Sequence, residues 1–187
     1  PLLVLAATLL LFHLGNAAML PLLGQAIVAR GGGDPSALTG MTVIIAQLTM
    51  IPMALAAAAL AERRGYWVVL LLALLALPIR GAIAAYLTSP YGLIPVQMLD
   101  GVGAGLLGVA VPGLTARILS GTGHVNAGIG IVMTLQGVGA ALSPALGGEI
   151  AERFGYAAAF VALGLVATAG LVLWVAMRPL TAPACRA

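Results

Sequence analysis

Ionisable side chains are scarce in this chain, and a few of them fall inside long apolar stretches. His13 and Asn16 are three residues apart, so they share one face of a helix. A histidine there can accept a proton near neutral pH or hydrogen-bond a ligand, and it can equally be a structural residue bonded to a neighbouring helix. Because polar groups are costly in apolar surroundings, each is a functional-site hypothesis.

Two opposite charges lie on either side of one short connector, residues 88–91. Arg80 precedes it and Asp100 follows it at similar distances along the chain. We therefore expect both side chains at the same depth of two adjacent helices, where pairing offsets much of the cost of burying either charge. The sequence admits two interpretations: a structural ion pair, or a coupling site in which Asp100 carries a proton or cation and exchanges partners.

Three glutamines each occupy a different apolar stretch: Gln47, Gln97 and Gln136. An amide both donates and accepts hydrogen bonds, which suits an uncharged or zwitterionic solute. Amides also hold helices together, and the sequence does not choose between these roles. With His13 and Asn16, the glutamines form the set of candidate cavity residues.

Composition places these residues in a membrane. Of 187 residues, 62% are hydrophobic and 7% are charged, whereas a soluble domain carries about 25% charge. The lipid bilayer is therefore an expected partner. The net charge of +3 comes from arginines near the ends of apolar runs, so no nucleic acid is expected.

The residues of a catalytic or metal site are missing from the sequence. There are two histidines and no His-Glu-x-x-His pattern, so we expect no metal and no cofactor. Ser120 and His124 have the residue types of a nucleophile and base, but they fall in a glycine-rich loop without an oxyanion scaffold. The single cysteine, Cys185, excludes an intrachain disulfide. We predict no catalytic residues and no enzyme.

Six stretches are long and apolar enough to cross a bilayer as helices, which takes about 20 residues. They are residues 2–28, 40–61, 67–87, 92–118, 127–149 and 157–177. The predicted fold is an all-α integral membrane protein, one domain over residues 1–187 with a short cytoplasmic tail at 179–187. The chain starts at Pro1, directly before an apolar run, so we expect a fragment of something longer.

Arginines indicate the orientation of these helices. Alternating connectors place most of them on the side that holds both ends of the chain, namely Arg63, Arg64, Arg117, Arg178 and Arg186. Arg30 and Arg153 fall on the other side. Because basic residues are enriched in cytoplasmic loops, both termini are predicted to be cytoplasmic.

A short motif occurs twice. Residues 61–66, which include Glu62, Arg63, Arg64 and Gly65, match residues 151–156 at five of six positions. Three predicted spans separate the copies, so the copies face opposite sides of the membrane. This predicts two inverted three-helix repeats, about 1–90 and 91–178. The alternative is a common helix-ending pattern of arginine, glycine cap and interfacial aromatic.

Small residues and proline recur in two of the spans. Gly101, Gly105 and Gly108 form a stripe that lets another helix approach closely. In the fifth span the small residues Gly139, Ser143 and Gly147 share a face, Gly148 follows them, and Pro144 favours a kink. We interpret these as packing and hinge features.

In combination, these motifs resemble those of the major facilitator superfamily, in the C-terminal half of a twelve-helix transporter. Residues 62–66 are similar to its basic loop, and residues 97–105 resemble its fourth-helix motif with Gln97 at the usual arginine. Residues 139–148 resemble the glycine-proline motif of antiporters, with Ser143 in place of one glycine. The resemblance implies that spans one, two, four and five line a central cavity, with three and six peripheral except for Arg80.

The function that this resemblance implies is secondary active transport of a small solute by alternating access. The proton is the expected coupling ion, efflux is a candidate direction, and a bacterial inner membrane is the expected location. A preceding six-helix half in the same native chain, or a second copy, would complete the transporter. The alternative is a non-transporting membrane scaffold or a channel subunit.

Overall fold

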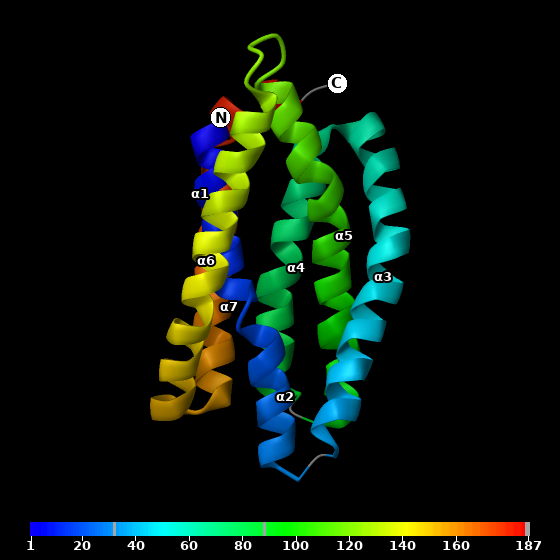
Figure 1. The fold of residues 1–187 in the computed structure, drawn as a ribbon, viewed down its shortest axis with the longest axis vertical. Coiled ribbons are helices and arrows are strands. Elements are labelled where there is room, and N and C mark those ends of the chain that lie inside the picture. Colours follow the sequence, from blue (N-terminus) through cyan, green and yellow to red (C-terminus); the bar gives the residue numbers. More distant parts are fainter. Residues whose placement is uncertain (32, 88, 186–187) are drawn as a thin grey trace.

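The computed structural model describes residues 1–31, 33–87 and 89–185, so Arg186 lies outside the described residues. Over these ranges the chain is helical, with short connectors (Figure 1). The helices are α1 (Leu2–Asn16), α2 (Met19–Ala29), α3 (Pro35–Arg64), α4 (Tyr66–Tyr86), α5 (Leu93–Ile118), α6 (Val125–Phe154), α7 (Tyr156–Ala176) and α8 (Arg178–Thr181). Six helical segments of the described residues can span a membrane, with α1 and α2 together forming the first. The predicted six-helix architecture is confirmed.

The second and fifth spans are longer than predicted. Helix α3 begins at Pro35 because Asp34 caps it: its Oδ1 accepts the backbone N–H groups of Ser36 and Ala37 at 2.7 and 3.0 Å. Proline suits the first helical position, where its missing N–H has no intrahelical partner. The cap and proline extend α3 beyond the apolar stretch that defined the prediction.

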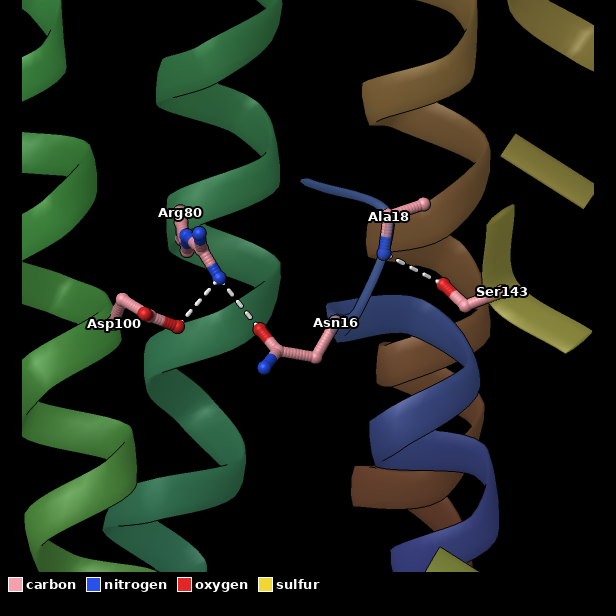
Figure 2. A network of polar contacts seen from close by, with 5 residues as sticks. All are labelled: Asn16, Ala18, Arg80, Asp100 and Ser143. Atoms are coloured by element: carbon pink, nitrogen blue, oxygen red, sulfur yellow. Dashed lines mark hydrogen bonds and ion pairs between the residues drawn. The ribbon is translucent and has the colours of Figure 1, made fainter. Parts of the chain in front are cut away.

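The first span is interrupted in the middle. Helix α1 ends at Asn16 and α2 begins at Met19, with Ala17 and Ala18 between them. Pro21 lacks the N–H that would bond the carbonyl of Ala17, so one backbone hydrogen bond of a continuous helix cannot form there. The backbone N–H of Ala18, next along the chain, donates to Ser143 Oγ on α6 at 2.9 Å (Figure 2). The break therefore lies beside the predicted polar pair and is tied to α6.

The two halves of the chain repeat each other's geometry. Helices α3 and α6 have 30 residues each, and α4 and α7 have 21 each. Between them lie Gly65 and Gly155, with φ of 79° and 86°, a left-handed conformation that favours glycine. Figure 1 shows the α3–α4 turn at the top and the α6–α7 turn at the bottom. The copies thus lie at opposite ends of the bundle, as an inverted repeat requires.

Helix packing follows the same symmetry. Helix α1 packs against α6 and α7, and α5 packs correspondingly against α3 and α4. A Cβ on Gly105 would lie 2.6 Å from the carbonyl oxygen of Met50 on α3, so this contact needs glycine. Gly139 faces the backbone of Leu10 on α1 in the equivalent way. These glycines bring the central helices into close contact.

Not every small residue in the predicted stripes serves packing. Gly101 lies against α3 and Gly147 against Ala18, but a Cβ on Gly108 or Gly148 would meet no described heavy atom within 4 Å. Gly108 lines a cavity instead. The stripe therefore supports helix contact through Gly101 and Gly105, and its third member faces open space.

Candidate functional site

A cavity of about 490 Å³ lies between α1, α4, α5 and α6. Its polar lining consists of His13, Asn16, Arg80, Asp100 and Gln136. The rest of the wall is mainly apolar and comprises Phe12, Ala76, Leu77, Leu99, Gly103, Ala104, Leu107, Gly108, Val111, Pro112, Ile129 and Met133. An apolar pocket of this size with a few convergent polar groups is the usual form of a small-molecule site.

Arg80 joins three helices at this cavity. Its Nη1 donates to Asp100 Oδ1 on α5 at 2.7 Å and to Asn16 Oδ1 at the end of α1 at 2.5 Å (Figure 2). The guanidinium comes from α4, so a single nitrogen bridges α1, α4 and α5. A charged donor makes such hydrogen bonds stronger than neutral ones. This network lies immediately beside the break in the first span.

The two charges of the pair are not equally accessible. The Arg80 side chain is 1% exposed, whereas the Asp100 side chain is 24% exposed. Arg80 Nε and Nη2 are buried and have no partner among the described residues, and the same holds for His13 Nε2. The guanidinium therefore lies behind the carboxylate, and Asp100 presents the accessible charge to the cavity.

The structure places the three glutamines in different environments. Gln136 lies on the cavity wall. Gln97 is fully buried away from the cavity, and its amide atoms have no hydrogen-bond partner in the described part of the chain. Gln47 is exposed on α3 and does not line this cavity. Of the residues predicted to line a cavity, His13, Asn16 and Gln136 meet there.

The expected division between lining and peripheral spans is not what this cavity shows. Span two does not line this cavity, because the glycines of α5 bring α3 onto the side of α5 away from it. That span two lines the central cavity of a whole transporter stays a prediction. Span three contributes Ala76 and Leu77 as well as Arg80. Sequence reasoning missed these apolar wall residues because nothing in their type distinguishes them from lipid-facing ones.

A second hollow of about 640 Å³ lies among α2, α3 and the start of α7. Its polar lining is Gln25, Thr39, Thr42 and Tyr156, and it contains no charged side chain. The first cavity combines a hollow with a buried ion pair, so we take it as the candidate functional site. Across the described ranges, no cluster of three or more potential metal ligands is present.

The end of the bundle that holds the first copy of the repeated motif is fixed by aromatic and arginine contacts. The guanidinium of Arg117 lies 4.9 Å from the ring centre of Tyr66, and that of Arg178 lies 5.0 Å from the ring of Trp67. Trp67 also stacks on Trp174. These cation–π and ring contacts join α4, α5 and α7 near their ends.

Comparison with known proteins agrees with this architecture. The family model described as Major Facilitator Superfamily matches residues 5–185, which is nearly the whole chain. This chain belongs to the major facilitator superfamily. Its six long apolar helices make this superfamily member an integral membrane protein.

Curated relatives are longer than this superfamily member. Two proteins of Mycobacterium tuberculosis, from strains CDC 1551 / Oshkosh and ATCC 25618 / H37Rv, are each described as an uncharacterized MFS-type transporter. Each is 37% identical over 180 residues, which cover 96% of this chain and 43% of the relative. The chain therefore spans less than half the length of the relatives that it matches.

Solved structures with this fold include the peptide transporter POT. Its complex with sulfate aligns with a TM-score of 0.82 at 20% identity, covering 98% of this chain and 39% of that one. A substituted form in complex with alafosfalin aligns with a TM-score of 0.81 at 22% identity, covering 96% and 38%. At this identity the similarity establishes the six-helix fold alone.

Proposed function

We propose that this chain is one six-helix half of a proton-coupled secondary transporter, which moves a small solute through the cavity by alternating access. The observation that carries the proposal is the network of Arg80, Asp100 and Asn16 on the wall of that cavity. Ionisable groups inside a membrane bundle are expensive and characteristically mark a solute or proton pathway. Membership of a transporter superfamily points the same way.

Asp100 is the proposed coupling group. The other four carboxylates, Asp34, Glu62, Glu149 and Glu152, lie at or near the ends of helices. Protonation of Asp100 would neutralise the charge that faces Arg80, leaving the guanidinium bonded to neutral Asn16. Since Arg80 joins α1, α4 and α5, the loss of that attraction would loosen α5 from the other two. Proton binding would thereby bias the packing of the helices around the cavity.

The break in the first span supports movement at this site. Ala17 and Ala18 separate α1 from α2, and the Asn16 contact with Arg80 lies directly before them. Ser143 holds the Ala18 N–H and replaces the helical partner lost there. A helix broken beside a cavity is a common arrangement at transporter binding sites.

A second six-helix unit is the proposed partner. Helices α3 and α6 are far less buried than α4 and α5, and their exposed apolar side chains include Leu48, Leu55 and Leu142. Met133 both lines the cavity and is largely exposed, so a further unit would close the cavity there. The shorter length relative to the curated relatives favours a unit in the same native chain. We place this chain as the C-terminal half, with both termini cytoplasmic, in a bacterial inner membrane.

Accessibility of the cavity from the two faces of the membrane tests this proposal. Ala104 lines the cavity and is exposed, so Ala104→Cys in a Cys185→Ala background reports its access. The intact native protein is labelled in membrane vesicles of either orientation with a charged, membrane-impermeant thiol reagent. We expect labelling from both faces without ion conduction. Leu165→Cys, mid-way along α7 and exposed away from the cavity, is the matched control and should stay unlabelled.

The same experiment distinguishes the alternatives. A scaffold without alternating access would leave Ala104→Cys unlabelled from at least one face under all imposed pH gradients. A channel would label from both faces and conduct ions in a planar bilayer. Either result would contradict the transporter proposal.

A further inference from the structure

We infer that the cavity binds a cationic amine carried on an apolar body, with the ammonium group on Asp100. The inference rests on the proposed function, because it names the solute class of the same cavity. Its basis is the unequal exposure of the two paired charges, together with the acceptors and apolar walls around the carboxylate.

Asp100 has an oxygen available for a ligand. Oδ1 accepts the hydrogen bond from Arg80, and no described residue donates to Oδ2. Because the Asp100 side chain is 24% exposed and Arg80 is 1% exposed, a ligand entering the cavity meets the carboxylate first. Arg80 already offsets part of the Asp100 charge, but the carboxylate is the more exposed member of the pair, so the cavity favours a cation over an anion.

Further acceptors line the same cavity as Asp100. An ammonium has three donors, and Asp100 Oδ2 takes one of them. Gln136 lines the same cavity, and its side chain has no hydrogen-bond partner among the described residues. His13 also lines the cavity, and because its Nε2 is buried, a ligand there would meet Nδ1. In its neutral form, a histidine offers one ring nitrogen as an acceptor.

The remaining wall suits an apolar body. Phe12, Leu107 and Met133, from three different helices, are among its side chains. A volume of about 490 Å³ accommodates an arylalkyl chain. Such a ligand would place its charged end at Asp100 and its body along these side chains.

Ligands of other charge fit less well. An anion would need Arg80, which is almost inaccessible, and it would approach the like charge of Asp100. A neutral alcohol would remove water from Asp100 without supplying a countercharge. The ammonium therefore has the advantage over both.

Three probes with one body and different head groups test the charge preference: 4-phenylbutylammonium, 4-phenylbutan-1-ol and 4-phenylbutanoate. Equilibrium binding to the intact native protein is measured in detergent by titration calorimetry. We expect the ammonium to bind about tenfold or more tightly than the alcohol, and the carboxylate to bind weakest. Equal affinity for ammonium and alcohol, or preference for the carboxylate, would overturn the inference.

Three variants assign the preference to Asp100. Asp100→Asn should abolish the ammonium preference while leaving alcohol binding within about threefold. If that variant fails to fold because Arg80 is left unpaired, the double variant Arg80→Leu/Asp100→Asn removes both charges and should give the same loss. Asp100→Glu keeps the charge and should retain the preference. A double variant that still selects the ammonium would overturn the inference.

A proton and the ammonium should compete for the same carboxylate. Lower pH should therefore weaken ammonium binding and leave the alcohol unaffected, and Asp100→Asn should remove most of this dependence. Arg80 on α4 contacts Asp100 directly, and the other polar or charged groups on the wall of the same cavity are Asn16 and His13 on α1 and Gln136 on α6. Of these, His13 is another group that can take up a proton, and any contribution from it to the pH dependence remains in Asp100→Asn.

These measurements are separable from the transport proposal. If Ala104→Cys shows alternating access but the ammonium has no advantage, the function stands and the solute class is wrong. If the ammonium binds selectively without alternating access, the binding site stands and the function is wrong.

Discussion

Removing one charge of the Arg80–Asp100 pair should destabilise the protein by an amount that depends on which charge is left. Breaking a buried ion pair costs about 3–5 kcal/mol because the remaining charge is uncompensated. Asp100→Asn leaves a guanidinium that is 1% exposed, so its cost should approach about 5 kcal/mol. Arg80→Leu leaves a carboxylate that is 24% exposed to the cavity, so its cost should be nearer about 3 kcal/mol.

The double variant completes this prediction. Arg80→Leu/Asp100→Asn leaves no unpaired charge, so it should be less destabilised than either single variant. The two residues are in direct contact at 2.7 Å, and contacting residues are expected to be strongly non-additive. The residual cost comes from Asn16, which loses the hydrogen bond from Arg80.

The free energy of unfolding can be measured in lipid bicelles by steric trapping for all four proteins. The expected order, from most to least stable, is wild type, double variant, Arg80→Leu and Asp100→Asn. An additive cycle, or an Asp100→Asn variant more stable than Arg80→Leu, would refute the idea that a buried guanidinium stands behind an accessible carboxylate.

Three smaller perturbations test the packing and the chain end. Gly105→Ala should lower the free energy of unfolding by about 1–3 kcal/mol in the same assay, because its Cβ would overlap a carbonyl on α3. Gly108→Ala, whose Cβ would meet no described atom within 4 Å, should be nearly neutral. Equal effects of the two substitutions would contradict the close contact at Gly105. Ser143→Ala should lower the free energy of unfolding by about 1–3 kcal/mol, because it leaves the Ala18 N–H unpaired. An unchanged stability would show that the break between α1 and α2 does not depend on the hydrogen bond from Ala18 to Ser143. Burial raises the pKa of the Cys185 thiol to about 11, so little reactive thiolate exists below that pH. Maleimide labelling at pH 8 should thus be slow in the folded protein and fast in denaturing detergent, and rapid labelling of the folded protein would contradict its burial.

The sequence was sufficient to predict the spans and the position of the charge pair. Apolar length defines a membrane helix, and Arg80 and Asp100 share a depth because both are counted from one short connector. The repeated glycine motif predicted two turns at opposite ends of the bundle, and Gly65 and Gly155 share their backbone conformation there. These features depend on the residue types of one short segment and on the number of residues that separate them.

The lining of the cavity could not be predicted in the same way. Gln97 and Gln136 are the same residue type in similar spans, yet one is fully buried and the other lines the cavity. That difference depends on the rotation of α5 and α6, which packing against other helices decides. The bond from Arg80 to Asn16 joins helices distant in the sequence, and no spacing rule connects them.

The most direct test of proton-coupled alternating access is the labelling of Ala104→Cys with and without the charge of Asp100. In vesicles of both orientations, the ratio of the labelling rates from the two faces reports how the protein divides between the two proposed states. The account predicts that Asp100→Asn shifts this ratio at neutral pH, and that low pH shifts it in the same direction in the protein that retains Asp100. A ratio that is unchanged by both would contradict the claim that the charge of Asp100 couples proton binding to the movement of the helices.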